Sequence, residues 1–171
     1  MNVFIRAAAE RLSAAGVGVD VFTRARDERR PEVQELGNGS RLINIQAGPN
    51  APVPKDELPR FLPEFLGGVL RRARAEGSDY ALVHTHYWLS GWVGRSAREI
   101  WGVPLVASFH TLGKVKNYSL ARGERPEPPF RLSGEERVIA DADRLVAATP
   151  VPFPPAGARG EPLHEGQAVG A

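Results

Sequence analysis

Two clusters of polar and aromatic side chains hold the residue types best suited to chemistry in this sequence. The first contains His84, His86 and Tyr87, the second contains His110 and Thr111, and each follows an apolar run typical of a strand. Open parallel α/β sheets place their ligands at the carboxyl ends of the strands. An imidazole can donate to a sugar hydroxyl or meet a developing charge, and hydroxyl side chains pair well with a polyol. We therefore expect a binding site at these two strand ends.

Less specific interpretations of the same side chains stay open. The three histidines could bind zinc, but such a site needs fixed geometry and second-shell partners, and the flanking aromatic residues favour packing. His110 could instead be a structural histidine that hydrogen-bonds to the backbone. Tyr87 and Thr111, taken singly, are more often structural. We expect no metal ion and no cofactor.

Two basic residues are candidates for holding a phosphate group. Lys55 lies in a loop after a predicted strand, and Arg131 lies at the start of a predicted helix. A fork of donors beside the free N–H groups of a helix start suits a phosphate. Lys114 and Lys116, in a loop that contains glycine, favour an anion nearby. The alternative for each basic residue is an ordinary surface charge.

Composition excludes several classes of protein. The chain has 171 residues, no cysteine, and 22 Lys and Arg against 20 Asp and Glu, so its net charge is only +2. Without cysteine, the chain cannot form disulfides or thiolate metal sites. Its net positive charge is too small to indicate a surface that binds nucleic acid. No apolar run is long enough to cross a membrane, and Glu10 and Arg11 interrupt any signal-peptide core. We expect a cytoplasmic protein.

Periodicity and turn residues predict strands that alternate with helices. Strands are expected at residues 17–23, 41–47, 80–84, 103–109 and 144–148. Helices are expected at residues 2–15, 57–76, 89–100 and 132–141, with polar loops at 24–40 and 111–130. This alternation favours a Rossmann-like, doubly wound parallel α/β sheet. Residues 151–171, rich in Pro, Gly and Ala, are expected to form a disordered tail.

A resemblance to a known family covers residues 1–150. It rests on the strings MNVFIR, HTHYWLSGWVG, ASFHTLGKVKN, ARGERPEPPFR and GEERVIADADRLVAATP. In their order along the chain these strings resemble the N-terminal domain of retaining glycosyltransferases of family 4. Within that family they are most similar to members that act on D-inositol 3-phosphate and so begin mycothiol synthesis. Members of the sucrose-phosphate synthase type share parts of the same pattern.

The resemblance implies one half of a GT-B arrangement, in which two Rossmann-like domains face each other. The N-terminal domain would hold the acceptor, 1D-myo-inositol 3-phosphate, and a C-terminal domain would hold the nucleotide sugar, UDP-N-acetylglucosamine. His110 would be the catalytic residue, because it matches a histidine that lines the reacting centre. The residues implied to bind the acceptor are Asn2, Lys55, Tyr87, Thr111 and Arg131.

Departures from the family pattern leave the activity of this chain open. The family has a first strand and a Gly-rich loop before the position of Met1, and we expect the loss of that central strand to leave two unpaired edges. The donor-binding domain also has no counterpart in this sequence. The alternatives are a non-catalytic module that binds a sugar phosphate, or a fragment of the sucrose-phosphate synthase type. A homodimer is left open, and an NAD-dependent enzyme is disfavoured because no G-x-G-x-x-G follows a strand.

Overall fold

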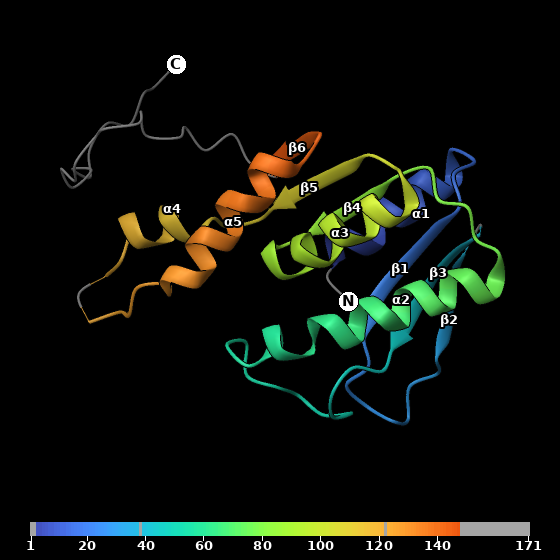
Figure 1. The fold of residues 1–171 in the computed structure, drawn as a ribbon, viewed down its shortest axis with the longest axis horizontal. Helices are drawn as coiled ribbons and strands as arrows, with labels where there is room; N and C mark the ends of the chain where they lie inside the picture. The colour runs from blue at the N-terminus through green and yellow to red at the C-terminus, as the bar shows by residue number, and fades with distance from the viewer. Residues whose placement is uncertain (1–2, 38, 122, 148–171) are drawn as a thin grey trace, which may run out of the picture.

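The computed structural model describes residues 3–37, 39–121 and 123–147, and these form a layered α/β structure (Figure 1). Its strands are β1 (Val19–Arg24), β2 (Val33–Gly37), β3 (Ser40–Ile45), β4 (Val83–His86), β5 (Leu105–Phe109) and β6 (Arg144–Ala147). Its helices are α1 (Val3–Ala14), α2 (Leu62–Glu76), α3 (Trp88–Trp101), α4 (Gly113–Tyr118) and α5 (Pro129–Asp141), with a 3-10 turn at Leu58–Phe61.

The strands form two three-stranded sheets in the orders β1-β3-β2 and β4-β5-β6. β1 is parallel to β3, and β5 is parallel to both β4 and β6. The expected α/β class with parallel strands is therefore confirmed. The two sheets are separate because β1 and β4 do not pair with each other, in agreement with the two unpaired edges that the resemblance led us to expect.

Strand β2 corrects the prediction that residues 24–40 form only a loop. It pairs antiparallel with β3, with an irregularity between Glu35 and Gly37. Its sequence, VQELG, has no clear alternation of apolar and polar residues that would predict a strand, and only Leu36 is buried. An edge strand of this kind is stabilised by hydrogen bonds to its neighbour. Those bonds cannot be predicted from the local sequence.

The helix boundaries also differ from the prediction in three places. The helix expected from residue 57 begins as a 3-10 turn, and α2 proper starts at Leu62. Pro63 lies in the first turn of α2, where its missing N–H would have no helical partner, so it starts the helix and does not kink it. The predicted loop 111–130 contains the short helix α4, and α5 begins at Pro129.

Helices cover both faces of the strands. In the view of Figure 1, α2 and α3 lie in front of the strands and α1 passes behind them. The buried cluster over the first sheet is formed by Ile43, Ile45 and Val69, with Phe22, Phe65 and Trp101 packed against it. Over the second sheet, Leu105 of β5 and Val138 of α5 are fully buried, and both lie close to glycines of α3. Each sheet is thus packed against at least one helix.

Two adjacent glycines in α2 test this packing, and we expect opposite effects from replacing them with alanine. A Cβ at Gly68 would lie 2.3 Å from the Cγ2 atom of buried Ile45, whereas one at Gly67 would meet only the flexible end of Arg71 at 3.2 Å. Gly68→Ala should lower the free energy of unfolding by roughly 1–3 kcal/mol through overpacking. Gly67→Ala should raise it by up to about 1 kcal/mol through helix propensity. Urea denaturation of the two variants measures this difference, and similar shifts in both would contradict the packing.

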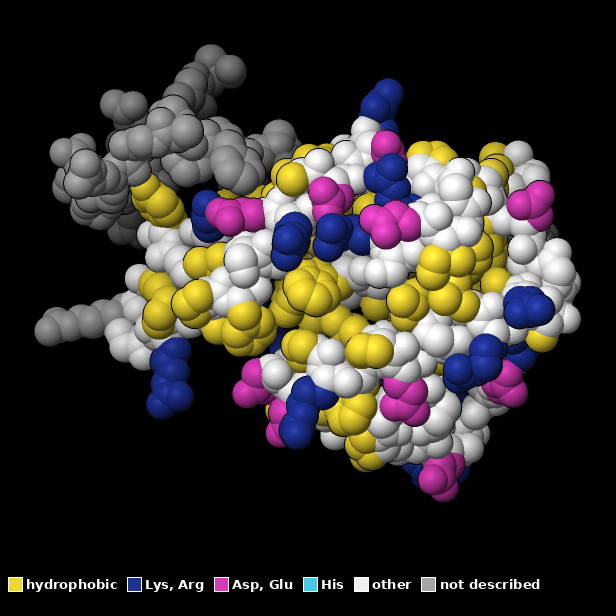
Figure 2. Space-filling view, in the orientation of Figure 1, with side chains coloured by type: hydrophobic (Ala, Val, Ile, Leu, Met, Phe, Trp, Pro, Cys, Tyr) yellow, Lys and Arg dark blue, Asp and Glu magenta, His cyan; other side chains and the backbone are white. Residues whose placement is uncertain are grey.

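The surface carries mixed charges around an apolar band. Figure 2 shows this band across the near face, with Lys, Arg, Asp and Glu side chains interspersed above and below it. Trp92 is 44% exposed and Phe130 is 46% exposed. No helix in the described part of the chain is long and apolar enough to cross a membrane.

Candidate functional site

Tyr87 occupies the turn between β4 and α3 in a conformation that is rare for its residue type. Its φ of 84° is the only positive φ of a non-glycine residue within the described ranges. The turn is held by its N–H, which donates to the carbonyl of Ser108 at 3.0 Å, and by the Ser90 hydroxyl, which donates to the Tyr87 carbonyl at 2.8 Å. Strained backbone of this kind clusters at functional sites. The turn thus orients the Tyr87 ring from the carboxyl end of β4.

Arg131 lies above that ring, with its guanidinium carbon 5.2 Å from the ring centroid. The residue is only 8% exposed, and it lies in the first turn of α5. Its Nε donates to Glu135 at 2.8 Å, its Nη1 lies 2.8 Å from Glu127, and its Nη2 donates to the carbonyl of Thr111 at 3.1 Å. Burial alone would lower the pKa of Arg131, but its hydrogen bonds to Glu135 and Glu127 raise it. The guanidinium therefore stays charged and joins α5 to the end of β5.

Glu135 fixes the loop that follows β5. This carboxylate is 3% exposed, and its second oxygen accepts the N–H of Gly113 at 2.7 Å. A Cβ at Gly113 would lie 2.7 Å from the Leu132 side chain, so a larger residue there would have to displace Leu132. The loop from Thr111 to Gly113 is consequently held against α5 by one buried ion pair.

Glu127 extends the same network towards α4. Its carboxylate accepts from Lys116 Nζ at 2.6 Å, and its N–H donates to Asn117 Oδ1 at 2.7 Å. The hydrogen bond from Lys116 lowers the pKa of Glu127, and the one from Arg131 lowers it further. The two basic and two acidic side chains of this network, Lys116, Arg131, Glu127 and Glu135, sum to no net charge.

The three histidines lie close together at the carboxyl ends of β4 and β5. The ring centroids of His84 and His86 are 4.3 Å apart, and those of His86 and His110 are 6.0 Å apart in a stacked arrangement. Burial, together with the charges of the neighbouring His84 and His110, lowers the pKa of His86 to about 4. The Nδ1 of His86 is buried and has no hydrogen-bond partner among the residues described. Within those residues, no group of His, Asp or Glu side chains could hold a metal ion.

The structure brings four of the six predicted site residues to one edge of the second sheet. Arg131 contacts both Tyr87 and Thr111, and His110 precedes Thr111 in the chain. Lys55 is exposed in the loop before the 3-10 turn, and it forms no ion pair with any residue described. Asn2 lies outside the described residues.

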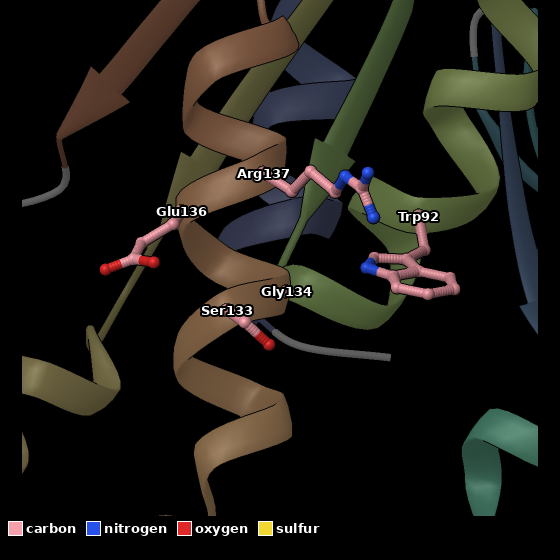
Figure 3. Close-up of a pocket in the computed structure, with 5 residues that line it drawn as sticks. All are labelled: Trp92, Ser133, Gly134, Glu136 and Arg137. Atoms are coloured by element: carbon pink, nitrogen blue, oxygen red, sulfur yellow. The ribbon is translucent and has the colours of Figure 1, made fainter.

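A surface hollow lies elsewhere, between α3 and α5. Figure 3 shows Trp92 from α3 and Arg137 from α5 extending towards each other across it, with Ser133, Gly134 and Glu136 as its other lining residues. None of the predicted site residues lines this hollow. The site at the strand ends is therefore separate from this hollow.

Sequence reasoning missed the acidic partners of Arg131. Glu127 and Glu135 stand four residues before and four residues after it, which is the spacing of helical ion pairs. That spacing could have indicated both contacts. Nothing in the local sequence marks the carboxylate of Glu135 as buried, because its burial depends on the loop after β5.

The fold and this edge define an α/β domain of the kind that forms the N-terminal half of GT-B glycosyltransferases. The chain belongs to the glycosyl transferase 4-like domain family, which it matches over residues 1–151. The resemblance expected from the sequence strings is thereby confirmed.

Individual relatives show which members of the family this chain is similar to. The chain is 51% identical over 152 residues to a D-inositol 3-phosphate glycosyltransferase of Actinosynnema mirum, covering 88% of this chain and 36% of the relative. It is 54% identical over 151 residues to the enzyme of the same name from Salinispora arenicola, covering 87% and 34%. A solved sucrose-phosphate synthase from Thermosynechococcus elongatus superposes with a TM-score of 0.76 at 36% identity, covering 84% of this chain and 35% of that one. The chain thus spans about a third of the length of the curated relatives it matches.

Proposed function

We propose that this chain, through its domain at residues 1–150, supplies the acceptor-binding part of a retaining glycosyltransferase that acts on D-inositol 3-phosphate. The observation that carries the proposal is the meeting of Tyr87, Thr111 and Arg131 at the carboxyl ends of β4 and β5. Two hydroxyls beside a guanidinium suit a phosphorylated polyol. The shared name of the relatives supports this choice of acceptor.

The phosphate needs more positive charge than Arg131 offers. A guanidinium carries five N–H donors, and three nitrogen atoms of Arg131 already have one partner each, which leaves two donors for a ligand. The surrounding network is neutral because Glu127 and Glu135 balance Arg131 and Lys116. Lys55, exposed and unpaired among the described residues, would supply the net charge that attracts the anion.

Transfer requires a nucleotide sugar, and we propose UDP-N-acetylglucosamine bound by a second domain that faces this edge. His110 would line the reacting centre, where its exposed imidazole can donate to the sugar or to developing charge. In a retaining reaction without a covalent carboxylate, the acceptor attacks on the face from which the nucleotide departs. Such catalysis depends on positioning and on stabilising the departing diphosphate. The reaction would belong to mycothiol synthesis in the cytoplasm.

Lys55→Ala provides the direct test of acceptor binding. We expect it to weaken binding of 1D-myo-inositol 3-phosphate by roughly 1–3 kcal/mol, because a charge-assisted contact to phosphate is lost. Isothermal titration calorimetry on the 171-residue chain measures the affinity, with unphosphorylated inositol as the ligand control. Arg60→Ala is the matched variant, since Arg60 is exposed and its one ion pair with a described residue is to Glu57 at 3.7 Å. Equal affinities in the two variants would remove Lys55 from the site.

The variant His110→Ala tests whether His110 acts in catalysis or only in packing. In a longer protein that contains the donor-binding domain, we expect turnover to fall by the order of 10²-fold with a smaller change in acceptor KM, as for loss of a donor at a reacting centre. His84→Ala is the control, because the Nε2 of His84 hydrogen-bonds to the Ser108 hydroxyl at 2.8 Å and its side chain is given no role in sugar transfer. A loss of folding in His110→Ala, or equal effects in both variants, would instead assign His110 a structural role.

A second candidate acceptor is a phosphorylated sugar. The solved sucrose-phosphate synthase favours it through its TM-score of 0.76. Competition between inositol phosphate and sugar phosphates for the same Lys55-dependent site distinguishes the two acceptors. A module that binds the acceptor without transferring sugar would give the same competition and no turnover when a donor domain is added.

A further inference from the structure

The loop that carries Lys55 begins beside the end of strand β1. It runs from residue 46 to residue 57, between the end of β3 and the 3-10 turn that precedes α2 (Figure 1). β1 and β3 are parallel, and their last residues, Arg24 and Ile45, are paired in register. Arg24 therefore lies at the point where the loop leaves the sheet, at the carboxyl ends of both strands.

The side chain of Arg24 is hydrogen-bonded to three carbonyls of this loop. Its Nη1 donates to Ala47 at 3.3 Å and to Pro49 at 2.7 Å, and its Nη2 donates to Ala51 at 2.7 Å. Carbonyl oxygens that converge on one point repel one another, and the charge of a guanidinium offsets that repulsion. Because the guanidinium is a rigid, planar fork of donors, it fixes the positions of these three residues relative to one another.

The part of the loop after Gly48 depends on Arg24 in particular. Gly48 has support of its own, because its N–H donates to Glu64 of α2 at 2.8 Å and its φ of 67° is one that glycine adopts without strain. Among the described residues, every hydrogen bond of residues 49–53 comes from Arg24. The path of the chain from Gly48 towards Lys55 is therefore set from the end of β1.

The chain between the last of these contacts and Lys55 is stiff. Residues 51–55 read APVPK, so two prolines stand between Ala51 and Lys55. A proline fixes its own φ at about −65° and restricts the residue before it to extended conformations. The four residues before Lys55 are thereby all restricted, and the N–H of Glu57 closes the following turn by donating to Pro54 at 3.0 Å. A restraint at Ala51 is thus transmitted along the chain to Lys55.

We propose that Arg24 is a positioning residue for Lys55, because by holding residues 47–51 it presents the Lys55 ammonium to the phosphate of the acceptor. This role rests on the proposed function, in which Lys55 binds that phosphate. Arg24 itself does not touch the ligand. When the loop is released, only a fraction of the molecules presents Lys55 correctly, and the apparent dissociation constant rises by the inverse of that fraction. The loss of affinity is therefore smaller than the loss caused by removing Lys55 itself.

Cleavage by endoproteinase Lys-C tests whether Arg24 holds the loop, whatever the loop binds. The chain has lysine only at positions 55, 114 and 116, and the last two lie in α4. In Arg24→Gln we expect cleavage after Lys55 to become about tenfold faster, because the loop opens more often. Cleavage within α4 should keep its rate, which also shows that the variant is folded. Arg26→Gln is the matched control, since Arg26 is exposed and its side chain forms no hydrogen bond or ion pair with a described residue.

The affinity of the 171-residue chain for 1D-myo-inositol 3-phosphate tests whether the loop acts through Lys55. Calorimetry should show binding about three- to tenfold weaker in Arg24→Gln when Lys55 is present, and a change of less than about twofold in a Lys55→Ala background. Arg26→Gln, which removes the same charge, should change the affinity by less than about twofold in both backgrounds. Pro52→Gly is an independent variant, because it leaves the Arg24 contacts in place and frees the chain between them and Lys55. It should weaken binding about threefold when Lys55 is present.

Equal rates of cleavage after Lys55 in the two arginine variants would overturn the positioning role of Arg24. Equal losses of affinity with and without Lys55 would also overturn it, because Arg24 would then act by its charge or on the fold as a whole. An unchanged affinity in Lys55→Ala alone would instead overturn the proposed function, and with it any part of Arg24 in acceptor binding, while faster cleavage would still show that Arg24 holds the loop. If Arg24→Gln does not fold, Pro52→Gly decides, and unchanged binding in that variant would count against the positioning role.

Discussion

Replacing Glu135 with alanine is expected to lower the free energy of unfolding by up to about 3–5 kcal/mol, because it removes one of the two carboxylates that pair with a buried guanidinium. Glu135 is 3% exposed and pairs with Arg131, which is 8% exposed. The same substitution removes the acceptor for the N–H of Gly113. Two buried donors would therefore lose their partners together.

The neighbouring residue supplies the control for this prediction. Glu136 also lies in α5 and pairs with Lys114, but both side chains are more than half exposed. Glu136→Ala should change stability by at most about 1 kcal/mol. Urea denaturation of both variants measures the contrast, and equal shifts would contradict a buried role for Glu135. Arg131→Ala should also destabilise the fold. A loss of inositol phosphate binding in that variant therefore has to be compared with its melting curve, which shows whether the variant is still folded.

Acidification is expected to destabilise the fold through His86. The pKa of His86 is about 4 in the folded protein, below its ordinary value of 6.5, with burial as the main cause and the neighbouring histidines adding to it. Between these two values the unfolded chain binds the proton and the folded chain does not. Stability should therefore be fully retained above pH 6.5 and should fall as the pH drops towards 4, by roughly 3 kcal/mol in total.

The variant His86→Gln isolates this effect. Hydrogen bonds also lower the pKa of Glu127, and the carboxylates lose their stabilising charge at the acidic end of the same range. Those groups and His84, whose pKa is also lowered by burial, remain in the variant, so the difference between the two stability curves reports the removal of His86. Chemical denaturation at intervals from pH 7.5 to pH 4 should give a flatter curve for the variant. Parallel curves for the two proteins would show that His86 does not titrate in this range.

The predictable part of the fold is its alternation of strands and helices. Helices α1, α2 and α3 follow from apolar spacing and from stop signals such as Gly77 and Gly102, each of which has a positive φ at a helix end. Strands β3, β4 and β5 lie within a few residues of the apolar runs that predicted them. The positions of His110 and Thr111 after β5 follow directly, because a residue's place at a strand end is a local property.

The sequence by itself determined the α/β class, the family and the strand ends at which polar residues collect. Only the tertiary structure decided that β2 pairs with β3 and that Arg131 is held by Glu127 and Glu135. The physical reason is the range of the interactions. Periodicity and turn chemistry act between neighbours in the chain, whereas sheet pairing and the burial of a charge depend on groups that folding brings together.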